Sequence, residues 1–87
     1  MPIDTFDVKV VKIHRLHQES RIKAFVDLGV NDALVIKGLR VVQGKKGLFV
    51  AMPSEQGKNE RWYERVQCVD KDVRSMISSK VLESYTT

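Results

Sequence analysis

The sequence predicts an α+β fold, an antiparallel β-sheet of about five strands followed by one C-terminal α-helix. Apolar and polar residues alternate through most of the chain, which is the pattern of a half-buried strand, and a helical period of about 3.6 appears only after residue 70. Strands followed by a separate helix are typical of α+β proteins. The length of 87 residues indicates a single domain spanning residues 1–87.

The first strand is expected over residues 8–16. Val8 and Val10 share one parity, whereas Val11 and Ile13 share the other. Such a shift of one residue turns the buried face of a strand over, and a β-bulge near Val10 and Val11 would absorb it. We therefore expect a bulge that keeps all four residues on the core side, followed by a turn over residues 17–20.

Residues 21–30 have the clearest strand pattern. The even-numbered positions are apolar and the odd-numbered ones mostly polar, as in an antiparallel sheet with one solvent-facing side. Phe25 is the exception, because it falls on the polar face. Asn31 and Asp32 have the residue types of a turn.

A third strand is expected over residues 33–42. Gly38 lies where its apolar parity changes, a position typical of a bulge or a sharp bend. Residues 43–47 predict a hairpin turn, because Gly44 and Gly47 are free to take positive φ.

The fourth strand, residues 48–52, is wholly apolar, which favours burial of both its faces. Pro53 ends it. The polar residues 54–60 are expected to form a loop, and residues 61–69 the fifth strand.

The helix is expected over residues 71–85. Asp70 is the predicted N-cap, and Asp72 favours the helix N-terminus electrostatically. The apolar face of this amphipathic helix consists of Val73, Met76, Ile77, Val81 and Tyr85.

No pattern of a catalytic or metal centre occurs in the sequence. His14 and His17 have no acidic or thiol neighbour and are expected to be solvent-facing. The Gly44–Gly47 segment lacks the Ser/Thr and the helix of a phosphate loop. Cys68 is the one cysteine, which excludes an internal disulfide, and we expect it to be buried. We therefore expect no enzyme, cofactor, metal or small-molecule substrate.

The N-terminal residues do not follow the pattern of a signal peptide. No apolar run approaches the roughly 20 residues that span a bilayer. We expect a cytoplasmic protein without membrane contact.

The net charge of +4 permits contact with phosphate backbones. Basic residues flank Trp62 and Tyr63, a combination that suits nucleic-acid backbones and unstacked bases. The alternative interpretation is a solvated sheet face whose aromatic residues lie in the core. The candidate phosphate-contacting residues, with little base-specific readout, are Arg40, Lys45, Lys46, Lys58, Arg61 and Arg65.

The Gly47–Ser54 segment, Gly-Leu-Phe-Val-Ala-Met-Pro-Ser, resembles the most characteristic block of the SpoVG family (stage V sporulation protein G). The resemblance runs in one collinear order over residues 6–85 and includes Arg21–Ala24, Leu39–Val42 and Val81–Tyr85. It implies a small cytoplasmic bacterial homodimer, and we expect the fourth strand and the helix to form the dimer interface. It also implies a non-enzymatic regulator of septation, sporulation and gene expression that binds DNA and in some members RNA.

The chain departs from the family pattern directly after Met-Pro-Ser. Family members commonly carry a Lys-Arg pair there, whereas this chain has Glu55 and Gln56. An acid at a phosphate contact weakens binding, and we expect Lys58, Arg61 and Arg65 to compensate. The departure also favours an alternative function, a protein-interaction module of the division machinery that does not bind nucleic acid directly.

Overall fold

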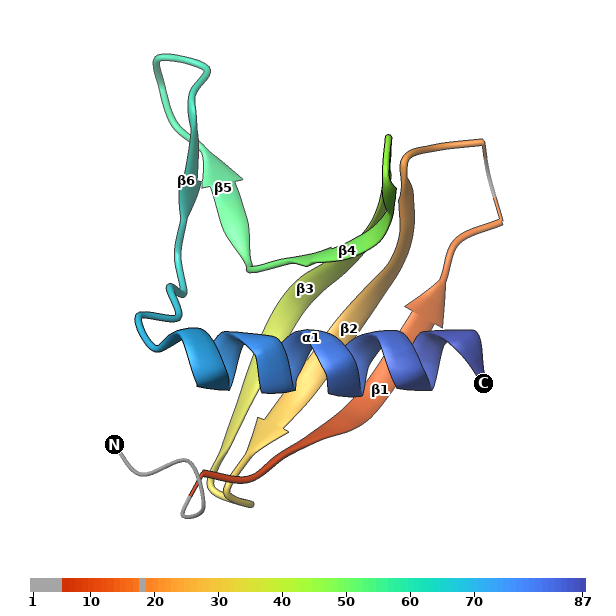
Figure 1. The fold of residues 1–87 in the computed structure, drawn as a ribbon. Coiled ribbons are helices and arrows are strands. Elements are labelled where there is room, and N and C mark those ends of the chain that lie inside the picture. Colours follow the sequence, from red (N-terminus) through yellow and green to blue (C-terminus); the bar gives the residue numbers. More distant parts are fainter. Residues whose placement is uncertain (1–5, 18) are drawn as a thin grey trace.

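The structure, a computed structural model, describes residues 6–17 and 19–87. Over these residues a four-stranded antiparallel sheet carries a helix across one face, and a two-stranded hairpin stands apart from it (Figure 1). The main sheet has the order β1-β2-β3-β4. The elements are β1 (Val8–Arg15), β2 (Ile22–Val30), β3 (Leu34–Gly44), β4 (Gly47–Ala51), β5 (Ser54–Gln56), β6 (Trp62–Glu64) and α1 (Lys71–Thr86).

The predicted α+β class is confirmed, but within the part of the chain that the structure describes the main sheet has four strands and not five. Residues 54–60, expected to be a loop, contribute β5, and the fifth strand expected over residues 61–69 shrinks to the three residues of β6. These two strands pair with each other and not with the main sheet. The chain leaves the main sheet between the end of β4 at Ala51 and the start of β5 at Ser54 (Figure 1). Pro53 lies in this connection, and its missing amide hydrogen cannot continue the β4 ladder.

The bulge predicted in β1 is present, but Val11 is not on the core side. Val10 pairs with Leu28 and Lys12 with Asp27, so Val11 is the extra residue. Val11 is 54% exposed, and its side chain lies over Gly29 on the face away from the helix. The bulge thus keeps Val10 and Ile13 packed against the core and leaves the unpaired Val11 on the opposite side of the sheet.

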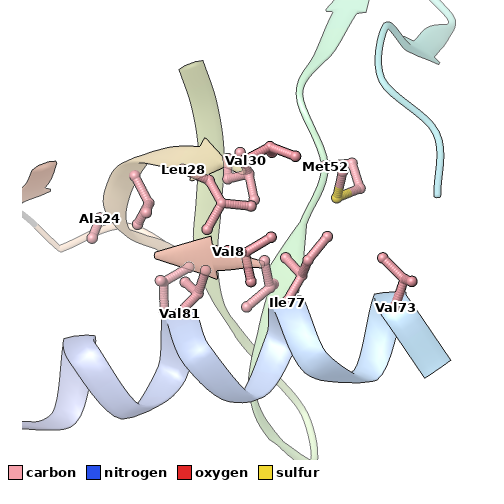
Figure 2. Packing of buried hydrophobic residues seen from close by; sticks show 12 residues of the cluster. Val8, Ala24, Leu28, Val30, Met52, Val73, Ile77 and Val81 are labelled. Atoms are coloured by element: carbon pink, nitrogen blue, oxygen red, sulfur yellow. The ribbon is translucent and has the colours of Figure 1, made fainter. Parts of the chain in front are cut away.

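The hydrophobic core lies between α1 and the main sheet (Figure 2). Ala24, Val26, Leu28 and Val30 of β2 are buried, which confirms the predicted alternation. From the helix, Figure 2 shows residues of the predicted apolar face pointing into this layer, namely Val73, Ile77 and Val81.

The prediction that both faces of β4 are buried is wrong. Val50 is buried, whereas its neighbour Phe49 is 47% exposed. The reason is that α1 covers one side of the sheet, and none of the other described elements packs as a layer on the opposite side of β4 (Figure 1).

Both ends of α1 have side-chain partners. At the N-terminus, Asp70 Oδ1 accepts hydrogen bonds from the amides of Asp72 at 2.8 Å and Val73 at 3.1 Å, which confirms the predicted N-cap. At the C-terminus, Arg15 Nη2 of β1 donates to the Tyr85 carbonyl oxygen at 2.8 Å. Because the last turn of the helix has no basic residue of its own, Arg15 supplies the positive charge that a helix C-terminus favours.

The turns of the main sheet follow the predicted residue types. Asn31 and Asp32 adopt φ of 51° and 52°, and Gly38 adopts 90° at the predicted irregularity of β3. In the β3–β4 hairpin, Gly44 pairs with Gly47, and Gly47 takes the positive φ of 126°. The turn expected over residues 17–20 includes Gln18, which lies outside the described residues.

Candidate nucleic-acid interface

The sheet face opposite the helix carries aromatic and basic side chains. One row of register partners crosses all four strands, from His14 through Phe25 and Arg40 to Ala51. Residues paired in this way project from the same side of the sheet. We call this side, defined by these four residues and Phe49, the open face; Phe25 is 39% exposed on it.

Positive charge is concentrated in the main sheet and its connections. Residues 8–53 contain nine Lys and Arg against three Asp and Glu, whereas residues 54–65, the β5–β6 hairpin, contain three of each. On this hairpin, Arg65 Nε lies 2.7 Å from Glu55 Oε2. The acid that departs from the family pattern is therefore paired with one of the bases expected to compensate for it.

Arg40 connects the open face to the β5–β6 hairpin. Its Nη2 donates a hydrogen bond to Ser54 Oγ and lies 3.5 Å from the Ser54 carbonyl oxygen. Its guanidinium carbon lies 5.3 Å from the centroid of the Trp62 ring, which is cation–π geometry. These contacts hold Trp62 beside the sheet, although the ring remains 61% exposed.

A shallow pocket of about 430 Å³ lies between the open face and the hairpin. Its aromatic walls are Phe25 and Trp62. Three cationic side chains and one carboxylate also face it, namely Lys37, Arg40, Arg65 and Glu55. Gly38, Pro53 and Ser54 complete the lining.

Only two of the six candidate residues, Arg40 and Arg65, line this pocket. Lys45 and Lys46 are exposed at the tip of the β3–β4 hairpin. Lys58 and Arg61 are exposed in the turn between β5 and β6. In the view of Figure 1 both tips project above the helix, as two separate points.

Sequence reasoning left Phe25, Lys37 and Trp62 out of the candidate set. The alternative interpretation, with the aromatic residues in the core, is wrong for Trp62 and for Tyr63, which is 44% exposed. The signal for Phe25 was present, since it broke the apolar–polar alternation of its strand. Lys37 gave no comparable signal, because its pocket requires a hairpin that composition did not predict.

Short-range hydrogen bonds order the β5–β6 turn despite its polar composition. The Gly57 amide donates to the Arg61 carbonyl oxygen at 2.8 Å, and Asn59 Nδ2 donates to the Tyr63 hydroxyl at 2.9 Å. The Tyr63 ring lies against Gly57, where an added Cβ would approach it to 2.7 Å. Tyr63 thus packs within the turn, whereas Trp62 contacts Arg40 of the main sheet.

Outside this region, one ion pair shifts two pKa values. Lys9 Nζ lies 2.7 Å from Asp32 Oδ1. Their hydrogen bond, helped by the attraction of opposite charges, raises the pKa of Lys9 and lowers the pKa of Asp32. Both side chains are largely exposed, so the pair is expected to be weak.

The remaining candidate groups form no cluster among the described residues. His14 and His17 are exposed as predicted, and no three His, Cys, Asp or Glu side chains gather at a metal-binding distance in residues 6–17 and 19–87. Cys68 is half-buried and not buried as expected, because its Sγ reaches the Asp70 carbonyl oxygen at 3.5 Å beside the exposed N-cap. Over the same residues, the structure contains no helix with the length and apolar character needed to cross a membrane.

A profile of the SpoVG family matches residues 5–87. The chain belongs to the SpoVG family. A relative from Fusobacterium nucleatum, named "Putative septation protein SpoVG", is 39% identical over 77 residues, which cover 86% of this chain and 83% of the relative. Relatives of the same name from Bdellovibrio bacteriovorus and Staphylococcus carnosus are 34% and 33% identical and cover 91% and 86% of this chain, and 69% and 70% of their own lengths. The SpoVG resemblance expected over residues 6–85 is confirmed.

Proposed function

We propose that this SpoVG-family chain is a small bacterial regulator that binds DNA, or RNA, through the open face and the tip of the β3–β4 hairpin. The observation that supports this most is the excess of nine basic over three acidic residues in residues 8–53, next to exposed Phe25 and Trp62. A role in septation and sporulation is part of the proposal and rests on the family and on the names of its relatives. We place the protein in the cytoplasm and assign it no catalytic step.

Binding would be driven by neutralisation of phosphates. Each phosphate contact on duplex DNA releases counterions and contributes about 0.9 to the slope of log affinity against log salt. Lys45 and Lys46 are exposed at a narrow tip, and the described residues offer neither of them an ion pair. They are therefore the cations most available to a phosphate backbone.

The proposal is tested by fluorescence anisotropy with labelled duplex and single-stranded DNA. We expect a Lys45→Ala/Lys46→Ala variant to bind more weakly and to lose about 1.8 from its salt slope on duplex DNA. A Lys71→Ala/Lys80→Ala variant is the matched control, since it removes the same charge from exposed positions of α1. Equal losses in both variants would mean that net charge alone binds the DNA, and no loss in the first would exclude this tip.

The basic residues of the β5–β6 hairpin are tested separately. A Lys58→Ala/Arg61→Ala/Arg65→Ala variant is expected to weaken binding less per charge removed, because Arg65 is already paired with Glu55 at 2.7 Å. Unchanged affinity in this triple variant would remove these three residues from the site.

We also propose that the protein is a homodimer. β4 is an edge strand of the main sheet, and an edge strand presents unpaired backbone groups that a second copy can pair with. A domain of this size also has a small core of its own. Sedimentation equilibrium is expected to give twice the 10.0 kDa mass of one chain, and a monomer at micromolar concentration would contradict the proposal.

A second candidate function is a protein-interaction module of the division machinery. It is favoured by Glu55 and Gln56, which stand where the family resemblance leads us to expect two bases, and by the balanced charge of residues 54–65. This candidate predicts nucleic-acid binding that is weak or lost at physiological salt, and a defined protein partner in a pull-down from cells. A pull-down that recovers only nucleic acid would count against it.

A further inference from the structure

The pocket beside Arg40 brings together two aromatic rings from distant parts of the sequence. Phe25 of β2 and Arg40 of β3 are register partners and so lie side by side on the open face. Trp62 reaches the same place from β6, with its ring 5.3 Å from the Arg40 guanidinium. Both Phe25 and Trp62 line the pocket, and both remain accessible, at 39% and 61% exposed.

A purely structural role does not account for Trp62. The ring is not part of the hydrophobic core cluster, and among the described residues its one cation–π partner is Arg40. Trp is highly buried on average, so a Trp ring that stays mostly in solvent is unusual, and Trp is enriched at binding interfaces. The rigid support beneath it, Arg40 bonded to Ser54, would hold the ring in position before a ligand arrives.

The charge around the pocket matches a phosphate-linked ligand. Lys37, Arg40 and Arg65 face it, and Glu55, the one carboxylate that the described residues contribute to its lining, is paired with Arg65. The volume of about 430 Å³ lies within the range of small-ligand sites. Aromatic walls with a cationic rim are the combination by which single-stranded nucleic acids are bound, the rings stacking on bases and the cations contacting phosphates.

We propose that the pocket between Phe25, Arg40 and Trp62 receives an unstacked base of single-stranded nucleic acid, so that the protein prefers single strands to duplexes. The inference rests on the proposed nucleic-acid binding and specifies the ligand of that site. In a duplex the faces of the bases are covered by their neighbours, so a duplex can offer this pocket phosphates but not a free ring.

The test uses the protein's own fluorescence, because Trp62 is the one tryptophan of the sequence. The probe is an oligothymidylate of about 12 nucleotides, titrated into the full chain while tryptophan emission and the anisotropy of a label on the DNA are both recorded. We expect the emission of Trp62 to be quenched in parallel with the rise in anisotropy. A full anisotropy change with unchanged tryptophan emission would overturn the inference.

Substitutions of Trp62 distinguish the effect of its aromatic ring from the effect of its size. We expect Trp62→Leu to lower affinity for the oligothymidylate about tenfold, within the range measured for loss of one stacked base, while Trp62→Phe keeps most of it. Duplex affinity should change less than about twofold in either variant, since phosphate contacts remain. Phe49→Leu tests whether any exposed aromatic residue of the open face would serve, because Phe49 does not line the pocket; we expect it to lower affinity for the oligothymidylate less than Trp62→Leu does.

The outcomes distinguish this inference from the function on which it rests. If the wild-type protein binds neither probe at low salt, the proposed nucleic-acid binding fails and the pocket assignment fails with it. If it binds both probes equally and Trp62→Leu has no effect, only the pocket assignment fails. If Trp62→Leu and Phe49→Leu weaken binding equally, the exposed aromatic residues of the open face contact the nucleic acid non-specifically, and the pocket is not a base site.

Discussion

Replacing Arg40 with Ala should release the β5–β6 hairpin from the main sheet while leaving the core intact. Arg40 is half-buried and reaches Ser54 and Trp62 from the middle of β3. The core residues on either side of it, Leu39 and Val41, point to the opposite face and are fully buried. The substitution therefore removes contacts between sheet and hairpin without opening a cavity in the core.

The expected cost follows from the contacts that are lost. A hydrogen bond from a charged group contributes about 1.5–3 kcal/mol, and a cation–π contact at an exposed site about 0.5–1 kcal/mol. Because Trp62 is largely solvent-exposed, we take the lower end and expect the hairpin to open about 2 kcal/mol more easily. At about 1.4 kcal/mol per tenfold, this corresponds to about a 30-fold increase in the population of the open state.

Amide hydrogen exchange measures this opening residue by residue. The reporters lie within the hairpin, because a two-stranded hairpin without support from a sheet is only marginally stable; they are the Arg65 amide, bonded to the Pro53 carbonyl oxygen at 2.7 Å, and the Gly57 amide, bonded to the Arg61 carbonyl oxygen. Both should exchange about 30-fold faster in Arg40→Ala, and amides of β2 should not change. Arg40→Lys should resemble Ala more than wild type, because Lys keeps the charge but loses the planar, stacking guanidinium. Unchanged exchange at Arg65, or equal acceleration throughout the sheet, would refute the reasoning.

Three further predictions concern stability. Asp70→Ala removes the N-cap of α1 and should cost about 1 kcal/mol, seen as a melting temperature lowered by about 4–8 °C; an unchanged melting temperature would contradict the capping role. Leu39→Ala empties a fully buried site and should cost about 2–5 kcal/mol in urea unfolding, and a loss below about 1 kcal/mol would contradict its place in the core. Asp32→Asn should flatten the pH dependence of stability at both extremes. The Asp32 contribution is present above its ordinary pKa of 3.8 and is lost as the pH falls through its lowered folded pKa. The Lys9 contribution is present below 10.5 and is lost as the pH rises through its raised folded pKa. Thermal unfolding across pH, compared between wild type and Asp32→Asn, checks both, and identical profiles would contradict the pairing.

Elements whose pattern is set by burial could be predicted from sequence. β2 alternates because one face packs on α1, and α1 repeats its apolar residues for the same reason. Asp70 was predictable because capping depends on residues two and three positions away. In β1 the bulge was predictable but the side chosen by Val11 was not, since the extra residue has no ladder partner to determine its direction.

The β5–β6 hairpin could not be predicted from pattern, because all residues of β6 and two of the three in β5 are exposed. Its strands are determined by cross-strand bonds and by Tyr63 lying on Gly57, contacts that leave no apolar period. The pairing of Glu55 with Arg65 depends on the register of that hairpin, so it was hidden as well.

The sequence identifies some residues of the candidate site and misses others. Arg40 was selected for its charge, and its contact with Trp62 explains its position better than charge alone. The pocket joins residues from β2, β3 and β6, and no short-range signal in the sequence connects these segments.

The central claim, that this face binds nucleic acid electrostatically, is tested most directly by the salt dependence of binding. Anisotropy of a labelled single strand and a labelled duplex would be measured with wild-type protein across a salt series. The account predicts binding to both probes at low salt, with tighter binding to the single strand. On the duplex, the slope of log affinity against log salt concentration should correspond to several phosphate contacts, at about 0.9 per phosphate. Absence of binding to either probe at low salt would contradict the claim and favour a protein partner.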